Sequence, residues 1–593
     1  MGDKVFAQIP PGGYVISAHG EMSNKIAKLK EGDFVEMLIS PSNNLVLEAR
    51  KTEEQIEMFR AFIDDSFFRM ERLAYEPLYF TVDVQESKLA NVKKLIKENK
   101  EEEAEQLLAE VKESLYDLQP SLYESLEVET RGIWVDNFTI DHFYTRNDIV
   151  ELLDKLKRIN INVIYPDVYC YGEAIFPSKN VPQKSHFKNN FTDGDVLAIL
   201  IEEAHKRNIE VHPMVRIFAL QKGIDHFIET DRVQWLDKTK NNSYTNEDGN
   251  YWLCPALPEV RAYNLALLNE LVTNYDIDGV HLDYIRSETN FGYNSYMREL
   301  FQKEHGLDPI EINDEQTLQK FKSFKEDFVT IFVEQVFFEL KAIKPKIIIS
   351  AAAAAPYGWG LRDLGQNSLK WAQNRQIHYL TPMCYRKTAE DFSPLLDSEL
   401  IRMRNLTYIY PGLGLYLFDE CVAVKQIEAC RNTQLTGESL FSTSHLKSEY
   451  CWFLENGPWR LPAKPTFRDP LKAAQVILKD IIGRIEEFEP FFDDNHVTVL
   501  QEYVERLQEF SSRIDALQLR AWDTRDIREA NQEEEIQLQP MVTDLQRFSA
   551  QINRNARKDK SIPIPTAERL VSDINKVHAL LMPLLHTSKE FAK

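Results

Sequence analysis

Several predicted strands of this sequence end in a carboxylate, and residues 276–286, DIDGVHLDYIR, hold the clearest case. Alternation along a strand puts Val280 and Leu282 on one face and His281 and Asp283 on the other. Asp283 is therefore delivered to the end of its strand, where a carboxylate can act as an acid, a base or a nucleophile. The same side chain could instead cap a helix or pair with a nearby arginine, and the segment alone leaves both interpretations open.

Four other predicted strands end in polar or aromatic side chains. They are WVDN from residue 134, VIYPDVYCYGEAIFPS from 163, EVHPMVRIF from 210 and HYLTPMCYR from 378. In a parallel barrel the C-terminal ends of all strands meet at one rim, where active sites are built. The side chains expected there are Trp134, Asp136, Tyr165, Asp167, Tyr169, Glu173, His212, Met214, Arg216, Tyr385 and Arg386.

Carboxylates, aromatic rings and arginines together suit a sugar-binding site, because aromatic faces stack on pyranose rings while Asp, His and Arg hydrogen-bond hydroxyl groups. Hydrolysis of a glycosidic bond typically needs one carboxylic acid as general acid and one carboxylate as base or nucleophile. We expect Asp283 to be the principal catalytic carboxylate. Its candidate partners, in order of rank, are Glu173, Asp167 and Asp136. The candidate substrate-binding residues are His281, Tyr284, Arg286, Arg216, His212, Trp134, Tyr169 and Tyr385.

Short apolar strands alternate with amphipathic helices from residue 131 to about residue 446, a pattern typical of parallel βαβ units. Eight such repeats predict one (β/α)8 TIM barrel with long loops. A doubly wound open sheet is the alternative, but DNFT after the first strand is not the Gly-rich turn that such a fold needs. The predicted strands are 132–138, 162–169, 209–218, 279–285, 347–353, 378–385, 408–415 and 439–444. The clearest helices are 147–158, 195–207, 260–275, 318–342 and 369–376.

The regions that flank the predicted barrel, residues 129–460, differ from it in pattern. Residues 1–50 predict a small β-rich piece, and residues 51–128 predict a helical lead-in with one strand at 79–84. The proline-spaced stretch RLPAKPTFRDP predicts a linker. Residues 461–593 predict a helical bundle. The expected fold class is therefore α/β, a TIM barrel with a small α+β N-terminal region and an all-α C-terminal bundle.

Charge and composition narrow the classes of function. The 593 residues carry a formal net charge of -23, which repels phosphate backbones and anionic lipid heads and argues against nucleic-acid and membrane-surface partners. A neutral or cationic substrate is easier to reconcile with this charge. No apolar run predicts a bilayer span, and the start MGD lacks the core of a signal peptide. The six cysteines show no CxxC spacing, and no histidine cluster has zinc spacing, so we expect no metal site, no disulfide framework and no cofactor.

Residues 131 to about 446 resemble the glycosyl hydrolase-like family 10, the DUF187-type TIM-barrel glycosidases. The order and spacing of the matching motifs agree across the whole predicted barrel. The motifs are RGIWVDNF, NINVIYPDVYCYGEAIFPS, IEEAHKRNIEVHPMVRIF, CPALPEVRAYNLALLNELVTNYDIDGVHLDYIRS, IISAAAA and IHYLTPMCYR. The resemblance implies a TIM barrel that acts on polysaccharides, including peptidoglycan glycan strands, in secreted or envelope proteins of bacteria.

The resemblance also implies that Asp283 sits in the family's most characteristic site motif, with His281, Tyr284 and Arg286 around it. Glu173 stands where the family commonly has Asp. Two departures affect the expected subsites: Ser287 follows where the family usually continues with Tyr-Pro, and the fifth strand ends in alanines that bring no carboxylate.

These patterns predict a glycoside hydrolase that cleaves a bacterial cell-wall or environmental polysaccharide or oligosaccharide. The expected location is extracytoplasmic, secreted or in the cell envelope, with the signal peptide absent from this chain and a cytoplasmic location left open. The alternative function is a non-catalytic glycan-binding or envelope protein on a glycosidase barrel, because fold does not dictate chemistry. A third candidate, an α-amylase-like enzyme, ranks low because no glutamate follows the fifth strand.

Overall fold

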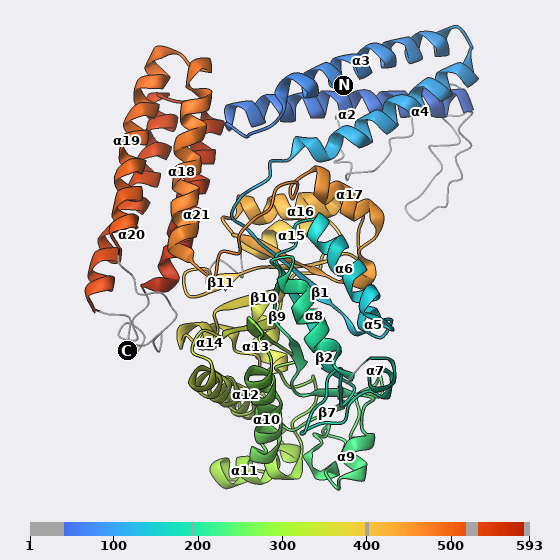
Figure 1. Cartoon of the computed structure of the whole chain (residues 1–593), viewed down its shortest axis with the longest axis vertical. Coiled ribbons are helices and arrows are strands. Elements are labelled where there is room, and N and C mark those ends of the chain that lie inside the picture. The colour runs from blue at the N-terminus through green and yellow to red at the C-terminus, as the bar shows by residue number, and fades with distance from the viewer. Residues whose placement is uncertain (1–40, 192–193, 398–402, 518–531, 586–593) are drawn as a thin grey trace, which may run out of the picture. The chain divides into compact units, whose positions relative to one another are not determined.

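The computed structural model describes residues 41–191, 194–397, 403–517 and 532–585 (Figure 1). The chain divides into two compact units, Met1–Met58 with Val82–Leu115 and Phe59–Thr81 with Tyr116–Lys593. Most of the predicted β-rich piece falls in residues 1–40 and lies outside the described residues. The last ten residues of that piece, 41–50, are helical.

The N-terminal part of the described chain is helical where one strand was expected. Residues 79–84 were predicted as a strand, and this prediction is wrong because they lie inside a helix. Val82, Leu89 and Val92 recur at helical spacing and are buried, so the longer pattern outweighs the short apolar run. The helices are α2 (Pro41–Phe68), α3 (Tyr75–Lys97) and α4 (Glu101–Leu118).

The larger unit contains a parallel barrel. Neighbouring strands pair in the order β11-β10-β9-β8-β5-β2-β1-β13-β12. The predicted seventh strand is split into β11, which pairs with β10, and β12, which pairs with β13, so residues 408–414 close the ring. This closure confirms the (β/α)8 barrel and rejects the open sheet. The strands are β1 (Thr130–Val135), β2 (Val163–Cys170), β4 (Glu210–Val211), β5 (Met214–Arg216), β8 (Gly279–Asp283), β9 (Ile348–Ala354), β10 (Tyr379–Met383), β11 (Tyr408–Ile409), β12 (Gly412–Gly414) and β13 (Gly437–Phe441).

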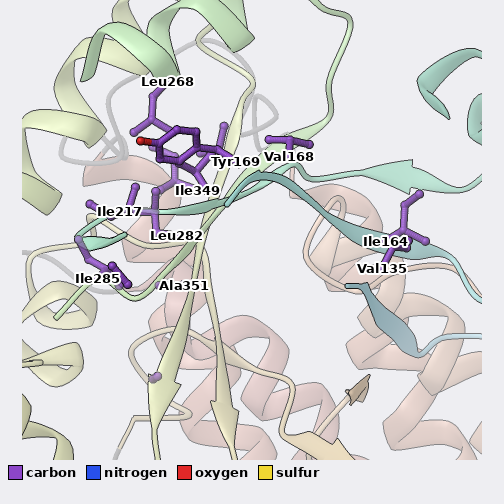
Figure 2. Close-up of a cluster of buried hydrophobic side chains, with 14 of the residues drawn as sticks. Val135, Ile164, Val168, Tyr169, Ile217, Leu268, Leu282, Ile285, Ile349 and Ala351 are labelled. Atoms are coloured by element: carbon purple, nitrogen blue, oxygen red, sulfur yellow. The ribbon is translucent and has the colours of Figure 1, made fainter. Parts of the chain in front are cut away.

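Helices follow the strands in sequence and cover their outward faces. Figure 2 shows Leu282 and Ile349 from the strands near Leu268, which belongs to α10. Burial of such apolar side chains supplies the main stabilisation of the barrel, at roughly 25 cal/mol per Å² of apolar surface. The covering helices are α6 (Arg146–Arg158), α8 (Val196–His205), α10 (Pro258–Asn274), α12 (Glu315–Ile343), α14 (Ser368–Gln373), α15 (Ala389–Leu395), α16 (Glu420–Asn432) and α17 (Ser448–Asn456).

The proline-spaced stretch predicted as a linker is packed against the N-terminal end of the barrel. The Phe467 ring is buried and lies 4.8 Å from the Tyr379 ring between centroids. Thr466 is buried as well, and Arg468 pairs with Glu210 at 2.7 Å. The stretch therefore closes the end of the barrel opposite the rim.

A helical bundle follows, as predicted from the apolar stripes of residues 461–593. Leu478, Leu500, Leu545 and Ile574, one from each helix, are all buried. The helices are α18 (Pro470–Phe488), α19 (Asp494–Ala516), α20 (Gln532–Arg554) and α21 (Ile564–Leu581). Among the helices of the described residues, none is long and apolar enough to cross a membrane.

Candidate active site at the barrel mouth

A layer of aromatic and imidazole side chains fills the middle of the barrel. Tyr165 of β2 stacks on His281 of β8 with 4.4 Å between ring centroids. Trp134 of β1 donates its Nε1–H to His281 Nε2 at 3.2 Å, and Ser350 lies 2.9 Å from His281 Nδ1. All four side chains are buried. They form the floor below the C-terminal ends of the strands.

His281 is part of this floor, and this position corrects its predicted role in binding substrate. The Ser350 hydroxyl donates to the carbonyl oxygen of Val280 at 3.2 Å, so it accepts the Nδ1–H of His281, and Nε2 accepts from Trp134. Burial holds the pKa of His281 well below its ordinary value, which keeps the ring neutral. Both ring nitrogens are therefore committed within the core.

Two carboxylates lie directly above this floor. Asp167 and Asp283 each follow a member of the stacked pair, Tyr165 or His281, by two residues on the same strand. Because inward-facing positions on a strand recur every second residue, about 6.6 Å along the strand, the two aspartates are the next inward positions of β2 and β8. The negative charge of Asp283 contributes to the raised pKa of Asp167, as expected for neighbours. The structure thus brings together two of the four predicted catalytic carboxylates.

Arg216 of β5, the strand between β2 and β8, holds Asp167 in place. Its Nε donates to Asp167 Oδ2 at 3.0 Å, and its Nη2 donates to the same oxygen and to Asn137 Oδ1, the latter at 2.9 Å. Its Nη1 donates to Gln221. Burial lowers the pKa of Arg216, but the charges of Asp167, Cys170 and Tyr284 and the hydrogen bonding to Asp167 together raise it above its ordinary value. Arg216 is therefore a fully bonded cation that orients a carboxylate.

The other oxygen of Asp167 has a different environment. Asp167 is completely buried, and its Oδ1 has no hydrogen-bond partner among the described residues. Burial raises the pKa of Asp167 to about 6, while Arg216 acts in the opposite direction. Buried polar atoms are usually paired, so an unpaired carboxylate oxygen is a position where a proton or a substrate atom is expected.

Asp283 is more open to the rim. Its Oδ1 accepts the backbone N–H of Tyr284 at 2.7 Å. Burial raises the pKa of Asp283, while the charge of Arg286 and the Tyr284 N–H act in the opposite direction. The Tyr284 N–H and the Arg286 cation therefore both stabilise the ionised form of Asp283 against the effect of burial.

Three residues around Arg216 have left-handed backbone conformations although none is glycine. They are Tyr171 at φ 55°, Gln221 at φ 52° and Tyr284 at φ 48°. The guanidinium carbon of Arg216 lies 5.5 Å from the Tyr171 ring centroid and 5.6 Å from that of Tyr284. Such conformations cost about 1 kcal/mol or more each and cluster at functional sites. The Arg216 guanidinium is therefore in contact with three residues whose backbone conformations are strained.

Asp136 and Glu173 have other surroundings. Asp136 caps α5 (Asn137–Ile140), accepting Thr139 N–H at 2.9 Å, and it also accepts the hydroxyls of Ser442 and Ser444. The helix cap accounts for the first bond, and the two serine bonds tie Asp136 to the segment after β13. Glu173 lies in the short strand β3 (Glu173–Ala174), opposite Cys170 in a hairpin. It is partly exposed, and no described side chain bonds its carboxylate.

Two predicted binding residues lie away from the mouth. Between Asp167 and Tyr169 the pairing of β2 with β5 shifts register, which breaks the alternation, and the Tyr169 ring turns outward among apolar side chains (Figure 2). Its hydroxyl lies 3.1 Å from that of Tyr263 on α10. His212 is buried near the N-terminal end of its strand, 3.0 Å from Glu210 and 2.8 Å from the Tyr379 hydroxyl. The predictions for Tyr169 and His212 are therefore wrong.

Trp134 is only 2% exposed, so its ring serves as floor and offers no open face for a sugar. This corrects its predicted role as a stacking platform. Tyr385 does lie at the mouth, with 5.5 Å between its ring centroid and that of Phe441 and 6.0 Å to that of Tyr416. Burial and the charge of Asp283 raise its pKa. Tyr416 is half exposed and continues this aromatic wall outward.

Replacing Tyr169 with Phe tests the corrected position. The change removes one buried hydroxyl bond to Tyr263, so the free energy of unfolding should fall by about 1 kcal/mol. The affinity for any glycan should stay unchanged, because the ring does not reach the mouth. Denaturant titration measures the stability, and ligand titration measures the affinity. A many-fold loss of affinity in a variant that stays folded would show that Tyr169 contacts the glycan after all.

Several residues of the mouth were not among those predicted from the sequence. Asn137 follows a predicted site residue and could have been included, because polar residues after barrel strands commonly face the rim. Gln221 and Trp252 come from β6 (Ala219–Gln221) and β7 (Tyr251–Trp252), a small sheet within a long loop that has no periodic pattern.

Among the described residues no group of three or more His, Cys, Asp or Glu side chains could hold a metal ion.

Known proteins resemble about half of this chain. The sequence is 24% identical over 265 residues to the glycosyl hydrolase YngK of Bacillus subtilis, covering 40% of this chain and 49% of YngK. It is 20% identical over 309 residues to the glycosyl hydrolase DigH of Escherichia coli K12, covering 46% and 66%. The chain thus spans about half of YngK and just under two thirds of DigH.

Solved structures of similar architecture include the α-L-fucosidase isoenzyme 2 of Paenibacillus thiaminolyticus. That match has a TM-score of 0.42 and 16% identity, and it covers 56% of this chain and 49% of the fucosidase. The catalytic domain of a β-amylase from Paenibacillus polymyxa matches with a TM-score of 0.40 and 11% identity, covering 56% and 96%. Residues 129–416, most of the barrel of this chain, match the model of the family described as glycosyl hydrolase-like 10.

Proposed function

We propose that this protein is a glycoside hydrolase that cleaves a bacterial cell-wall or environmental polysaccharide at the mouth of its barrel. The observation that carries the proposal is the pair of inward-facing carboxylates, Asp167 and Asp283, above the Tyr165–His281 stack. The match of residues 129–416 to the glycosyl hydrolase-like 10 family model supports the same class of reaction.

The two carboxylates have environments that suit different roles. Asp167 is completely buried, has one unpaired oxygen and has a pKa raised to about 6, which suits the general acid that protonates the leaving-group oxygen. Asp283 is more open and accepts a backbone N–H, which suits the carboxylate that acts at the anomeric carbon. On an N-acetylated sugar it would instead orient the substrate's own acetamido group. This assignment ranks Asp167 above Glu173 as the partner acid.

The remaining groups at the mouth would bind and orient the sugar. Tyr385 and Tyr416 offer rings for stacking on pyranose faces, and Tyr416 is half exposed. Arg216 would hold the Asp167 carboxylate in one orientation throughout each turnover. A cell-wall substrate would require an extracytoplasmic location, which cell fractionation tests.

The alternative, a glycan-binding protein without catalysis, is favoured by one observation. Arg216 makes two hydrogen bonds to one oxygen of Asp167, and a tightly paired carboxylate is a poor acid when it stays ionised. Incubation of the whole chain with peptidoglycan glycan strands, chitin and plant polysaccharides separates the two functions. Release of new reducing ends supports the hydrolase, whereas saturable binding without products would support the alternative.

A further inference from the structure

Arg286 is held at the mouth by two aromatic rings. Its guanidinium carbon lies 5.1 Å from the ring centroid of Tyr284 and 5.9 Å from that of Trp252. These two rings are themselves in contact, at 5.7 Å between centroids. Stacking on aromatic faces restricts the planar guanidinium to one orientation while leaving its edge available for hydrogen bonds.

The charge of Arg286 is not matched by any carboxylate bound to it. Among the described residues it forms no ion pair, and its Nε is buried without a hydrogen-bond partner. Three more deeply buried arginines of the barrel are paired: Arg216 with Asp167, Arg131 with Glu129, and Arg431 with the same glutamate. Arg286 shares the lack of an ion pair with other half-buried arginines such as Arg261, and it differs from them in lying beside Asp283 at the mouth. Its pairing group is therefore expected to come from outside the chain.

Arg286 is also close to the reacting position. Its charge is the strongest influence that opposes the rise in the pKa of Asp283 caused by burial, yet the two groups do not form a direct ion pair. The two side chains therefore interact through their charges without a direct bond between them. The edge of a guanidinium matches the two oxygens of a carboxylate, which it binds through two parallel hydrogen bonds.

We propose that Arg286 binds the carboxylate of an acidic sugar, so that the glycan taken by this site carries carboxyl groups. The inference rests on the proposed function, because it assigns Arg286 to a subsite of the same mouth. The net charge of -23 does not prevent such binding. Repulsion between exposed charges is largely screened beyond about 8 Å at physiological ionic strength, whereas the pair with Arg286 forms at contact distance.

Two matched pairs of sugars test the inference by calorimetric titration of the whole chain. N-acetylmuramic acid differs from N-acetylglucosamine by a lactyl ether that carries the carboxylate, and tri-galacturonic acid differs from its methyl ester by its charges. We expect the acidic member of at least one pair to bind about tenfold more tightly or better. The pair that shows this preference distinguishes a lactyl carboxylate from a uronic one.

The variant Arg286→Gln should lose the preference and bind both members of the pair equally. Arg286→Lys should keep part of it, because it retains the charge and loses the fork of donors. Arg232→Gln is the matched control, since Arg232 also lies over two rings, Trp235 at 4.8 Å and Tyr263 at 5.7 Å, and should keep the full preference. Equal binding of both members by the unaltered protein, or a preference that survives in Arg286→Gln, would overturn the inference. Titration needs no turnover, so a protein that binds with this preference but releases no product would contradict only the proposed hydrolase.

Discussion

Replacing Asp283 with Asn is expected to lower the rate of glycan hydrolysis by about a thousandfold or more, which is about 4 kcal/mol of transition-state stabilisation. An amide cannot supply the negative charge or the nucleophilic oxygen that the anomeric carbon needs. The fold should be kept, because the Asn carbonyl oxygen can still accept the Tyr284 N–H that Asp283 accepts at 2.7 Å. Measurement of product release and of thermal unfolding on the same preparation checks both parts.

A matched control is available in the same segment. The side chain of Asp276 is 87% exposed, and its pair with Lys344 is long at 3.4 Å. Asp276→Asn should therefore leave both activity and stability near those of the unaltered protein. Near-normal turnover by a folded Asp283→Asn variant would remove Asp283 from the catalytic role.

Replacing Asp167 with Asn is expected to reduce the rate about a hundredfold to ten-thousandfold on substrates with a poor leaving group. Burial raises the pKa of Asp167 to about 6, so the group holds its proton below that pH and loses it above. The rate of the unaltered protein should therefore fall as pH rises through about 6, and the variant should lack this alkaline limb. An aryl glycoside with a strongly acidic phenol needs little protonation, and the variant should cleave it at a nearly normal rate.

The leaving-group comparison separates an acid from a structural residue. Equal losses on both kinds of substrate would mean that Asp167 serves only to pair with Arg216. Glu173→Gln is the comparison variant. The sequence favours Glu173 as the acid, whereas the structure places it in a partly exposed hairpin. If the alkaline limb disappeared in Glu173→Gln and persisted in Asp167→Asn, the two assignments would be exchanged.

Local pattern predicted the barrel well because each element carries its own periodicity. The eight predicted strands coincide with the observed ones to within a few residues, although the third and the seventh are each split in two. The same reasoning failed at residues 79–84, where six residues could be judged only against the helix that contains them. It also failed at Tyr169, because a register shift between β2 and β5 turns the ring outward. Such shifts depend on the partner strand and leave no mark in the strand's own residues.

The depth of a side chain within the barrel could not be predicted either. Alternation correctly assigned His212, His281 and Trp134 to the inward face, but all three lie below the mouth. The face follows from a period of two, whereas the depth depends on how far each strand is shifted along its neighbours. For the same reason the long loop that supplies Gln221 and Trp252 could not be assigned to the site from its own residues.

The sequence by itself determined that eight strand and helix repeats form a barrel of a glycosidase family and that carboxylates end several strands. Tertiary structure decided which of those carboxylates meet. Asp283 was expected at the mouth, and the stack of Tyr165 on His281 shows that Asp167 is the acid beside it. The reason is physical: strand alternation is a local property of the chain, while proximity between strands arises only when the sheet closes and sets their relative stagger.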